Sequence, residues 1–135
     1  MIIASSDFKR CVDFGSYAIW HSLYSTVIGC LDQNHESILD AISFLQSGKC
    51  SSENAEKTAI QLNMIHDLLA ALPPDSAIYD IDNPHIDAPW KNNISPIVTS
   101  CANLFMTSDG KDLLFELVSL LTYASVANVS VAIPE

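Results

Sequence analysis

Four carboxylates and three ring-bearing side chains gather in residues 75–90, the segment of this sequence that is richest in chemically active groups. The carboxylates belong to Asp75, Asp80, Asp82 and Asp87, and the rings belong to Tyr79, His85 and Trp90. The segment contains no Lys or Arg, and its two prolines keep its second half out of a helix. Acidic and aromatic groups on a stiff, exposed loop are typical of a surface that binds a basic partner.

Metal binding is a second chemistry to consider for this segment. The best ligand set in the sequence is His85 with Asp80, Asp82 and Asp87. The spacing of Asp80 and Asp82 resembles the start of a calcium-binding loop, but the Gly and the late Glu of such a loop are missing. We therefore expect no metal and no other cofactor.

Catalysis has less support than binding. Neighbouring carboxylates act as general acid and base when a cleft raises the pKa of one of them, and an acidic loop with prolines is more often solvated. No nucleophile signature surrounds Cys11, Cys30 or His21, and no glycine-rich phosphate motif occurs. We expect that the protein is not an enzyme. The four cysteines form no C-x-x-C pair, so we expect reduced thiols.

The charge of the chain narrows the class of partner. Sixteen acidic residues against six basic ones give a formal net charge of −10, while 49% of the residues are hydrophobic. A chain this apolar has enough material for a folded core. Its negative charge argues against nucleic acids and anionic membranes, whose phosphates need cationic groups. It favours a basic protein as the partner.

The C-terminal part carries a long apolar run. Residues 113–133 contain one charge, Glu116, and are long enough to cross a bilayer. The spacing of the apolar residues is helical up to Ala124 and alternates from Val129 to Ile133, which favours a helix followed by a strand. The N-terminus lacks the basic and apolar regions of a signal peptide. We expect a cytoplasmic protein with no membrane segment.

The elements that must position the acidic segment follow from hydrophobic spacing and breaker residues. Met1 to Ala4 and residues 12–19 read as extended, with a turn at Gly15-Ser16. Helices are predicted over 20–31, from a cap at Asn34 to Gly48, and from Ser51 or Ser52 to 72. Ile78 to Ile81 reads as a short strand. A short helix is expected from the cap Ser95-Pro96 to Leu104, and the last helix begins after the polar break 107–112.

Helices that separate a few short strands indicate an α+β fold. We expect one domain over residues 1–135, with about five helices packed on a small antiparallel or mixed sheet of three to four strands. The helices should cover one face of this sheet. The C-terminal strand is predicted to pair with the N-terminal one because both have alternating patterns.

Three local patterns, taken in order, resemble a known family. They are the segments 21–26 (HSLYST), 78–95 (from IYDIDN to PW and NIS) and 105–113 (FMTSDGKDL). Their order and spacing resemble a family of bacterial immunity proteins from polymorphic toxin and contact-dependent growth inhibition systems, the family catalogued as immunity protein 70. The resemblance covers residues 12–125.

The resemblance implies a protein that binds one cognate toxin and neutralises it stoichiometrically by covering its active site. The toxin is expected to be basic and a nuclease, so that carboxylates stand where phosphates would lie. The resemblance assigns no binding residues; from the loop itself we take Asp80, Asp82, Asp87, Tyr79 and Trp90 as candidates, although Tyr79 and Trp90 also fit a packing role. The alternative is an acidic interaction module or adaptor without a toxin partner.

Overall fold

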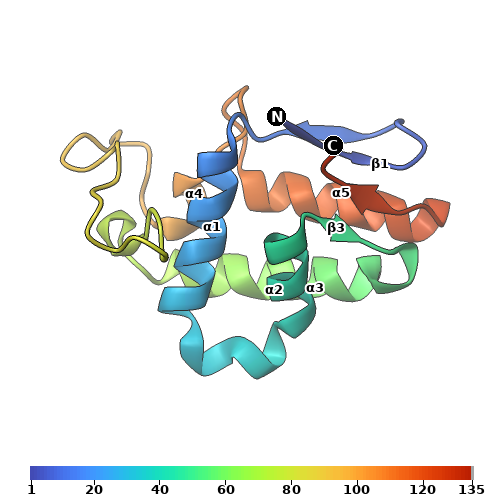
Figure 1. Ribbon diagram of the computed structural model, residues 1–135, viewed down its shortest axis with the longest axis horizontal. Coiled ribbons are helices and arrows are strands. Elements are labelled where there is room, and N and C mark those ends of the chain that lie inside the picture. The colour runs from blue at the N-terminus through green and yellow to red at the C-terminus, as the bar shows by residue number, and fades with distance from the viewer. Residues whose placement is uncertain (135) are drawn as a thin grey trace.

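The computed structural model describes residues 1–134, which form five α-helices, two short 3-10 helices and one sheet of four strands (Figure 1). In chain order the elements are β1 (Ile2–Ser5), β2 (Cys11–Asp13), α1 (Tyr17–Cys30), η1 (Asp32–Ser37), α2 (Leu39–Ser47), β3 (Lys49–Cys50), α3 (Ser52–Ala70), η2 (Pro74–Ser76), α4 (Cys101–Leu104), α5 (Leu113–Ala127) and β4 (Val131–Ala132). This architecture confirms the α+β prediction.

The sheet joins the two ends of the chain. Its strand order is β2-β1-β4-β3, and every neighbouring pair is antiparallel. Ala4 of β1 lies opposite Ala132 of β4, which confirms the predicted pairing of the first and last strands. The outer pairings place Val12 opposite Ile3 and Val131 opposite Cys50.

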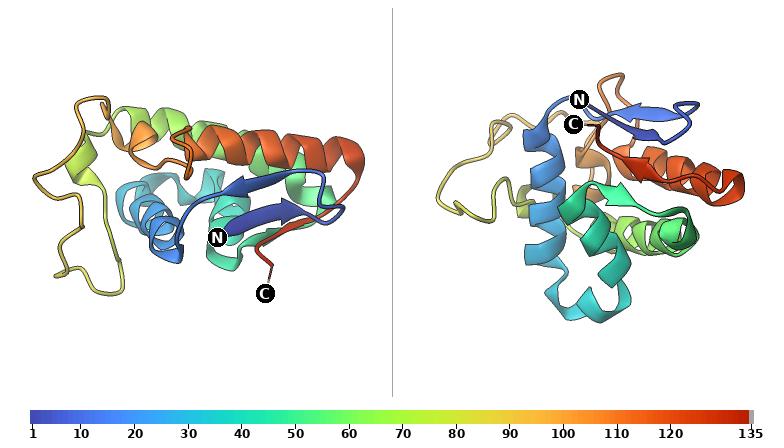
Figure 2. Two further views of the ribbon diagram at one scale, coloured as in Figure 1. Left: turned by 90° about the horizontal axis from the view of Figure 1, so that it is seen from above. Right: turned by 45° about the vertical axis from the view of Figure 1, so that its right-hand side comes forward.

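The helices lie on one side of this sheet (Figures 1 and 2). Helix α5 packs against β1, β2 and β4, helix α2 packs against β3, and α3 runs alongside α5 in the most extensive helix pairing of the described chain. At the end of the molecule away from the sheet, the segment between η2 and α4 projects as a long loop (Figure 1). Asp80, Asp82 and Asp87 lie on this loop, and Asp75 lies in η2 just before it.

The apolar stripe predicted for the last helix is the buried face of α5. Its members are at most 3% exposed: Leu113, Leu114, Leu117, Leu120, Leu121 and Ala124. The polar break before it forms a tight turn with Gly110 at φ +85°, closed by a bridge between Met106 and Asp112. The Asp112 carboxylate then caps α5 by accepting the backbone N–H of Phe115. No helix within residues 1–134 has the length and apolarity needed to span a membrane.

Two predicted element starts were wrong. Residues 17–19 form the first turn of α1 instead of an extended segment, because Ser16 takes an extended N-cap conformation after the Gly15 turn. A three-residue alternation is too short to separate a strand from a helical turn. The helix expected from Asn34 starts only at Leu39, and the 3-10 helix η1 precedes it. Its predicted end at Gly48 is confirmed by a left-handed C-cap with φ +71°.

Two further predictions failed around the long loop. Residues 78–81 form no strand, since their backbone bonds to side chains of α1. The helix expected from Ser95-Pro96 begins only at Cys101, where Ser100 and Asn103 make a capping box. Ile97, which the prediction placed on a buried face, is 70% exposed. Helical spacing alone therefore predicted a helix between residues 95 and 100 that does not form.

A polar cluster ties the sheet to α5. Asp7, in the turn between β1 and β2, accepts hydrogen bonds from the Tyr123 hydroxyl at 2.5 Å, the Ser5 hydroxyl at 2.7 Å and the Lys9 N–H at 3.1 Å. These donors, that of Tyr123 foremost, lower the pKa of Asp7 from 3.8 to about 2. The guanidinium of Arg10 lies 5.1 Å from the centre of the Tyr123 ring, so the same tyrosine also holds a cation.

We predict that D7N destabilises the protein in a pH-dependent way. Asp7 ionises more easily in the folded state, so its contribution is fully present above pH 3.8 and is lost as the pH falls toward its folded pKa of about 2. Urea unfolding should show a gap between wild type and D7N at neutral pH that shrinks through this window. The exposed Asp67 supplies the control variant, D67N. A stability gap that stays constant between pH 3.8 and about 2 would contradict a role for the ionised Asp7 carboxylate.

Candidate functional site

The loop is anchored by polar residues on helix α1. Ser22, Ser25 and Thr26 are fully buried although they carry hydroxyl groups. Their spacing of three and four residues places them on one face of the helix. Buried hydroxyls need partners, and these three find them in the backbone of the loop.

The hydroxyl groups on this face bond to backbone groups of the loop that would otherwise pair with a neighbouring strand. The Thr26 hydroxyl accepts the Ile78 N–H at 3.0 Å and lies 3.2 Å from the Ile78 carbonyl oxygen, which also accepts from the Ser22 hydroxyl at 3.0 Å. The Ser25 hydroxyl oxygen accepts the Ile81 N–H at 3.0 Å. Ile78 comes so close that a Cβ at Gly29 would lie 2.2 Å from its Cδ1 atom. This fixes the start of the loop against the helix.

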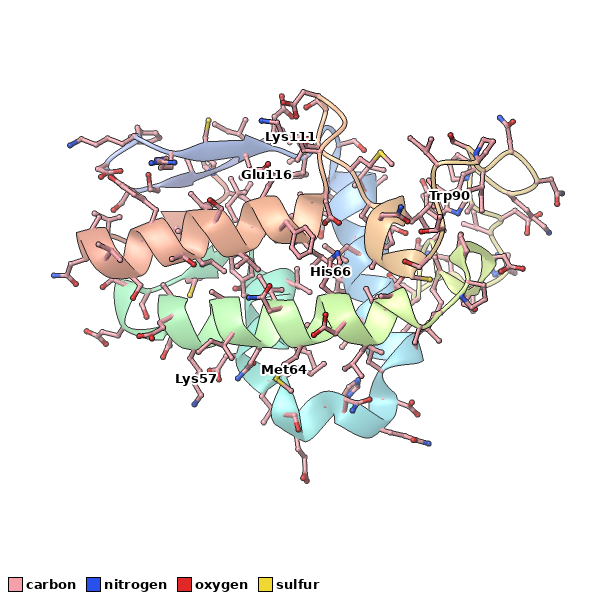
Figure 3. The ribbon with its side chains drawn as sticks, turned by 180° about the vertical axis from the view of Figure 1, so that it is seen from behind. Lys57, Met64, His66, Trp90, Lys111 and Glu116 are labelled. Atoms are coloured by element: carbon pink, nitrogen blue, oxygen red, sulfur yellow. The ribbon has the colours of Figure 1, made fainter. Side chains whose placement is uncertain are left out.

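Trp90 anchors the other side of the loop. Its ring meets Tyr79 edge-on at 5.6 Å between centroids and meets Phe105, a core residue that follows α4, at 6.4 Å. Figure 3 shows Trp90 at the base of the loop, beside α4. Both aromatic candidates are half-buried. Each therefore has the packing role that the sequence analysis held open for it.

Asp80 points inward and holds the loop together. Its carboxylate receives hydrogen bonds from the Asn83 amide at 3.0 Å and the Asp82 N–H at 3.0 Å, and lies 3.0 Å from Nε2 of His21 on α1. These contacts, led by Asn83, lower the pKa of Asp80 and keep it ionised. Its side chain is only 22% exposed. Asp80 is thus occupied with contacts inside the protein.

Asp82 and Asp87 are directed to solvent. Their side chains are 75% and 72% exposed. Asp82 reaches the His21 ring with one oxygen at 3.3 Å, and Asp87 pairs with Lys91 at 3.0 Å. Exposed ion pairs of this kind contribute little to stability. These two carboxylates are therefore available to a partner.

The loop encloses a hollow of about 480 Å³. Four of the five sequence candidates line it: Tyr79, Asp80, Asp87 and Trp90, while Asp82 lies outside its lining. The walls are largely apolar and include Ile78, Ile81, Pro84, Ile86 and Ile94. Apolar walls with a few charged groups are the usual composition of a binding pocket. The structure thus brings most of the candidates to one concave surface.

The residues that the sequence offered as its best metal ligand set, His85 with Asp80, Asp82 and Asp87, are not the ones that the structure brings together. Among residues 1–134, the one group of three ligands that lie close together is His21, Asp80 and Asp82, whose ligand atoms are within 4.8 Å of one another. His85 is exposed and does not belong to this group. His21 replaces it because α1 and the loop pack together. Sequence reasoning did not predict that His21, Ser22, Ser25 and Thr26 contact the loop, and the available signal was the polar spacing within an otherwise apolar helix.

A family model described as immunity protein 70 matches residues 5–133. No curated protein and no solved structure matches the chain. The matched range contains α1, the whole acidic loop and the turn before α5, the three regions that carried the resemblance in the sequence.

We predict that T26V loosens the loop. Valine has nearly the shape of threonine but leaves the Ile78 N–H without its partner, so the free energy of unfolding should fall by about 1–3 kcal/mol. Amide hydrogen exchange at Ile78 and Ile81 should accelerate. The matched control is T122V on the exposed side of α5, expected to change stability by less than about 0.5 kcal/mol. Equal effects of the two variants would contradict the anchoring role.

We also predict that the fold does not depend on a metal ion. His21 and Asp80 already make their hydrogen bonds to each other and to the loop, so no ion is needed to hold α1 and the loop together. Thermal melts with and without a chelator should superimpose. A fall in melting temperature with the chelator, reversed by added Zn²⁺ or Ca²⁺ and absent in H21Q, would instead assign the ion to these residues.

Proposed function

Because the chain belongs to the immunity protein 70 family, we propose that it binds a cognate bacterial toxin in the cytoplasm and neutralises it. The inhibition is stoichiometric: the protein covers the active site of the toxin and catalyses no reaction itself. The proposed toxin is a nuclease. A nuclease binds phosphates and therefore needs a basic active site. A chain with a net charge of −10 is suited to such a site.

One observation carries the placement of the interface on the acidic loop. The loop is held by Ser22, Ser25 and Thr26 at its start and by Trp90 further on, yet Asp82 and Asp87 remain exposed. A surface that is already ordered loses little conformational entropy when it binds. Its carboxylates can then take the positions of substrate phosphates in the toxin.

An adaptor without a toxin partner is the second candidate, and a different surface favours it. Large apolar residues are exposed on α3 and α5: Ile60 and Met64 on α3, and Phe115 and Val126 on α5. Ile60 and Val126 line one pocket between the two helices. Apolar side chains that gather on one face mark a protein-binding surface. If the acidic loop plays no part in binding, this face is where a partner would be sought.

The experiment is co-expression with the cognate toxin, which is to be sought in the reading frame next to this gene. We expect wild type to protect cells and the double variant D82N/D87N to fail, since each desolvated pair that is lost costs about 2–5 kcal/mol of binding free energy. The control E53Q/E56Q removes two exposed acidic charges from the start of α3, at the opposite end of the molecule, and should protect normally.

The single variant D80N separates binding from folding. Asp80 is held by His21 and Asn83, so D80N should lower the melting temperature, whereas D82N/D87N should melt like wild type. Full protection by a folded D82N/D87N variant would move the interface away from the loop. Failure of wild type to protect, or to co-purify with the adjacent toxin, would overturn the immunity function itself.

A further inference from the structure

The hollow within the acidic loop has two chemically different parts. Its walls are aliphatic and aromatic, with Ile78, Ile86 and Trp90 among them, and the acidic residues Asp75 and Asp87 also line it. A wholly apolar ligand would make no use of the acidic side of the hollow, and a small ion would leave the apolar walls uncovered. The combination suits a long side chain with an apolar stem and a positive end.

Lys91 indicates where the positive end belongs. It lines the same hollow, and its Nζ atom pairs with Asp87 at 3.0 Å. Both side chains are more than half exposed, so this pair is weakly held and easily exchanged. The protein thus fills the position with a cation of its own that an incoming cation can displace.

We propose that the hollow is a receptor pocket for an arginine side chain of the partner protein. The planar guanidinium is more weakly hydrated than an ammonium group, forms two parallel bonds to one carboxylate and stacks on aromatic rings. Asp87 supplies the carboxylate, and Tyr79 and Trp90 supply the rings. The molecule already pairs an arginine with a tyrosine, at Arg10 and Tyr123. The inference rests on the proposed function, because the arginine is assigned to the toxin.

The pocket can be tested without the toxin by using small probes. N-acetyl-arginine amide is titrated into the full-length protein, with N-acetyl-citrulline amide as the neutral probe of the same shape and N-acetyl-lysine amide as the second cation. The indole N–H signal of Trp90 in NMR spectra reports on the pocket. Trp20 is the internal control, because its indole is buried and donates to the Leu45 carbonyl oxygen.

We expect the arginine probe to shift the Trp90 signal saturably, with a dissociation constant on the order of 1–10 mM, as befits one side chain. The citrulline probe should bind at least about ten-fold more weakly because it has no charge to pair with Asp87. The lysine probe should also bind more weakly than arginine. The Trp20 signal should stay in place.

Two variants with opposite expected effects test the roles of the charged residues. D87N removes the carboxylate and should weaken arginine binding at least about three-fold. K91M keeps the aliphatic bulk of Lys91 but removes its competing charge, so it should strengthen binding at least about two-fold. E53Q, at the far end of α3, should leave the affinity unchanged. A loss of fold would weaken binding in both pocket variants, so a gain in K91M cannot come from instability.

Each contrary result overturns a defined part of the proposal. Equal binding of citrulline and arginine would make the hollow a purely apolar site, and tighter binding of lysine would exclude the arginine assignment. No shift of Trp90 with any probe would remove the pocket altogether. Protection of cells is measured separately: a failed pocket with intact protection removes the arginine site and leaves the immunity function standing, whereas arginine binding without protection refutes the immunity function.

Discussion

The arrangement of this protein depends on three buried hydroxyl side chains. Ser22, Ser25 and Thr26 lie on one face of α1 and bond to the backbone of Ile78 and Ile81, which has no partner strand. Buried backbone groups without partners are costly, and a long loop would otherwise have to find them in water. The helix therefore takes the place of a sheet edge, and the loop becomes a fixed part of the surface.

This anchoring divides the acidic residues into two kinds. Asp80 is drawn toward α1 and is held by His21 and Asn83, whereas Asp82 and Asp87 remain exposed. The same residue type therefore has a structural role at one position and is free for binding two residues later. Since each exposed carboxylate sits on an ordered backbone, the negative charge of the loop has a defined geometry.

The sheet end and the loop end of the molecule are held in different ways. At the sheet, pairing of β1 with β4 brings the chain ends together, and Asp7 connects the β1–β2 turn to Tyr123 of α5. At the loop, hydroxyl groups and Trp90 replace strand pairing. The loop is thus held by contacts that do not involve the sheet.

Sequence patterns by themselves determined the class of fold, the stripe of α5, the end of α2 at Gly48, and the pairing of the terminal strands. The first three features follow from hydrophobic period and breaker residues, which act locally, and the strand pairing was inferred from the alternating patterns at both chain ends. The sequence also singled out the acidic loop, because a run of carboxylates among prolines is visible without coordinates. Only the tertiary structure decided which carboxylate faces inward, that His21 and not His85 joins Asp80 and Asp82, and that residues 78–81 are not a strand. Those outcomes depend on contacts between α1 and a segment more than fifty residues away. The sequence does not reveal that the hydroxyls of Ser22, Ser25 and Thr26 are buried, because the loop backbone that covers them is distant in the chain.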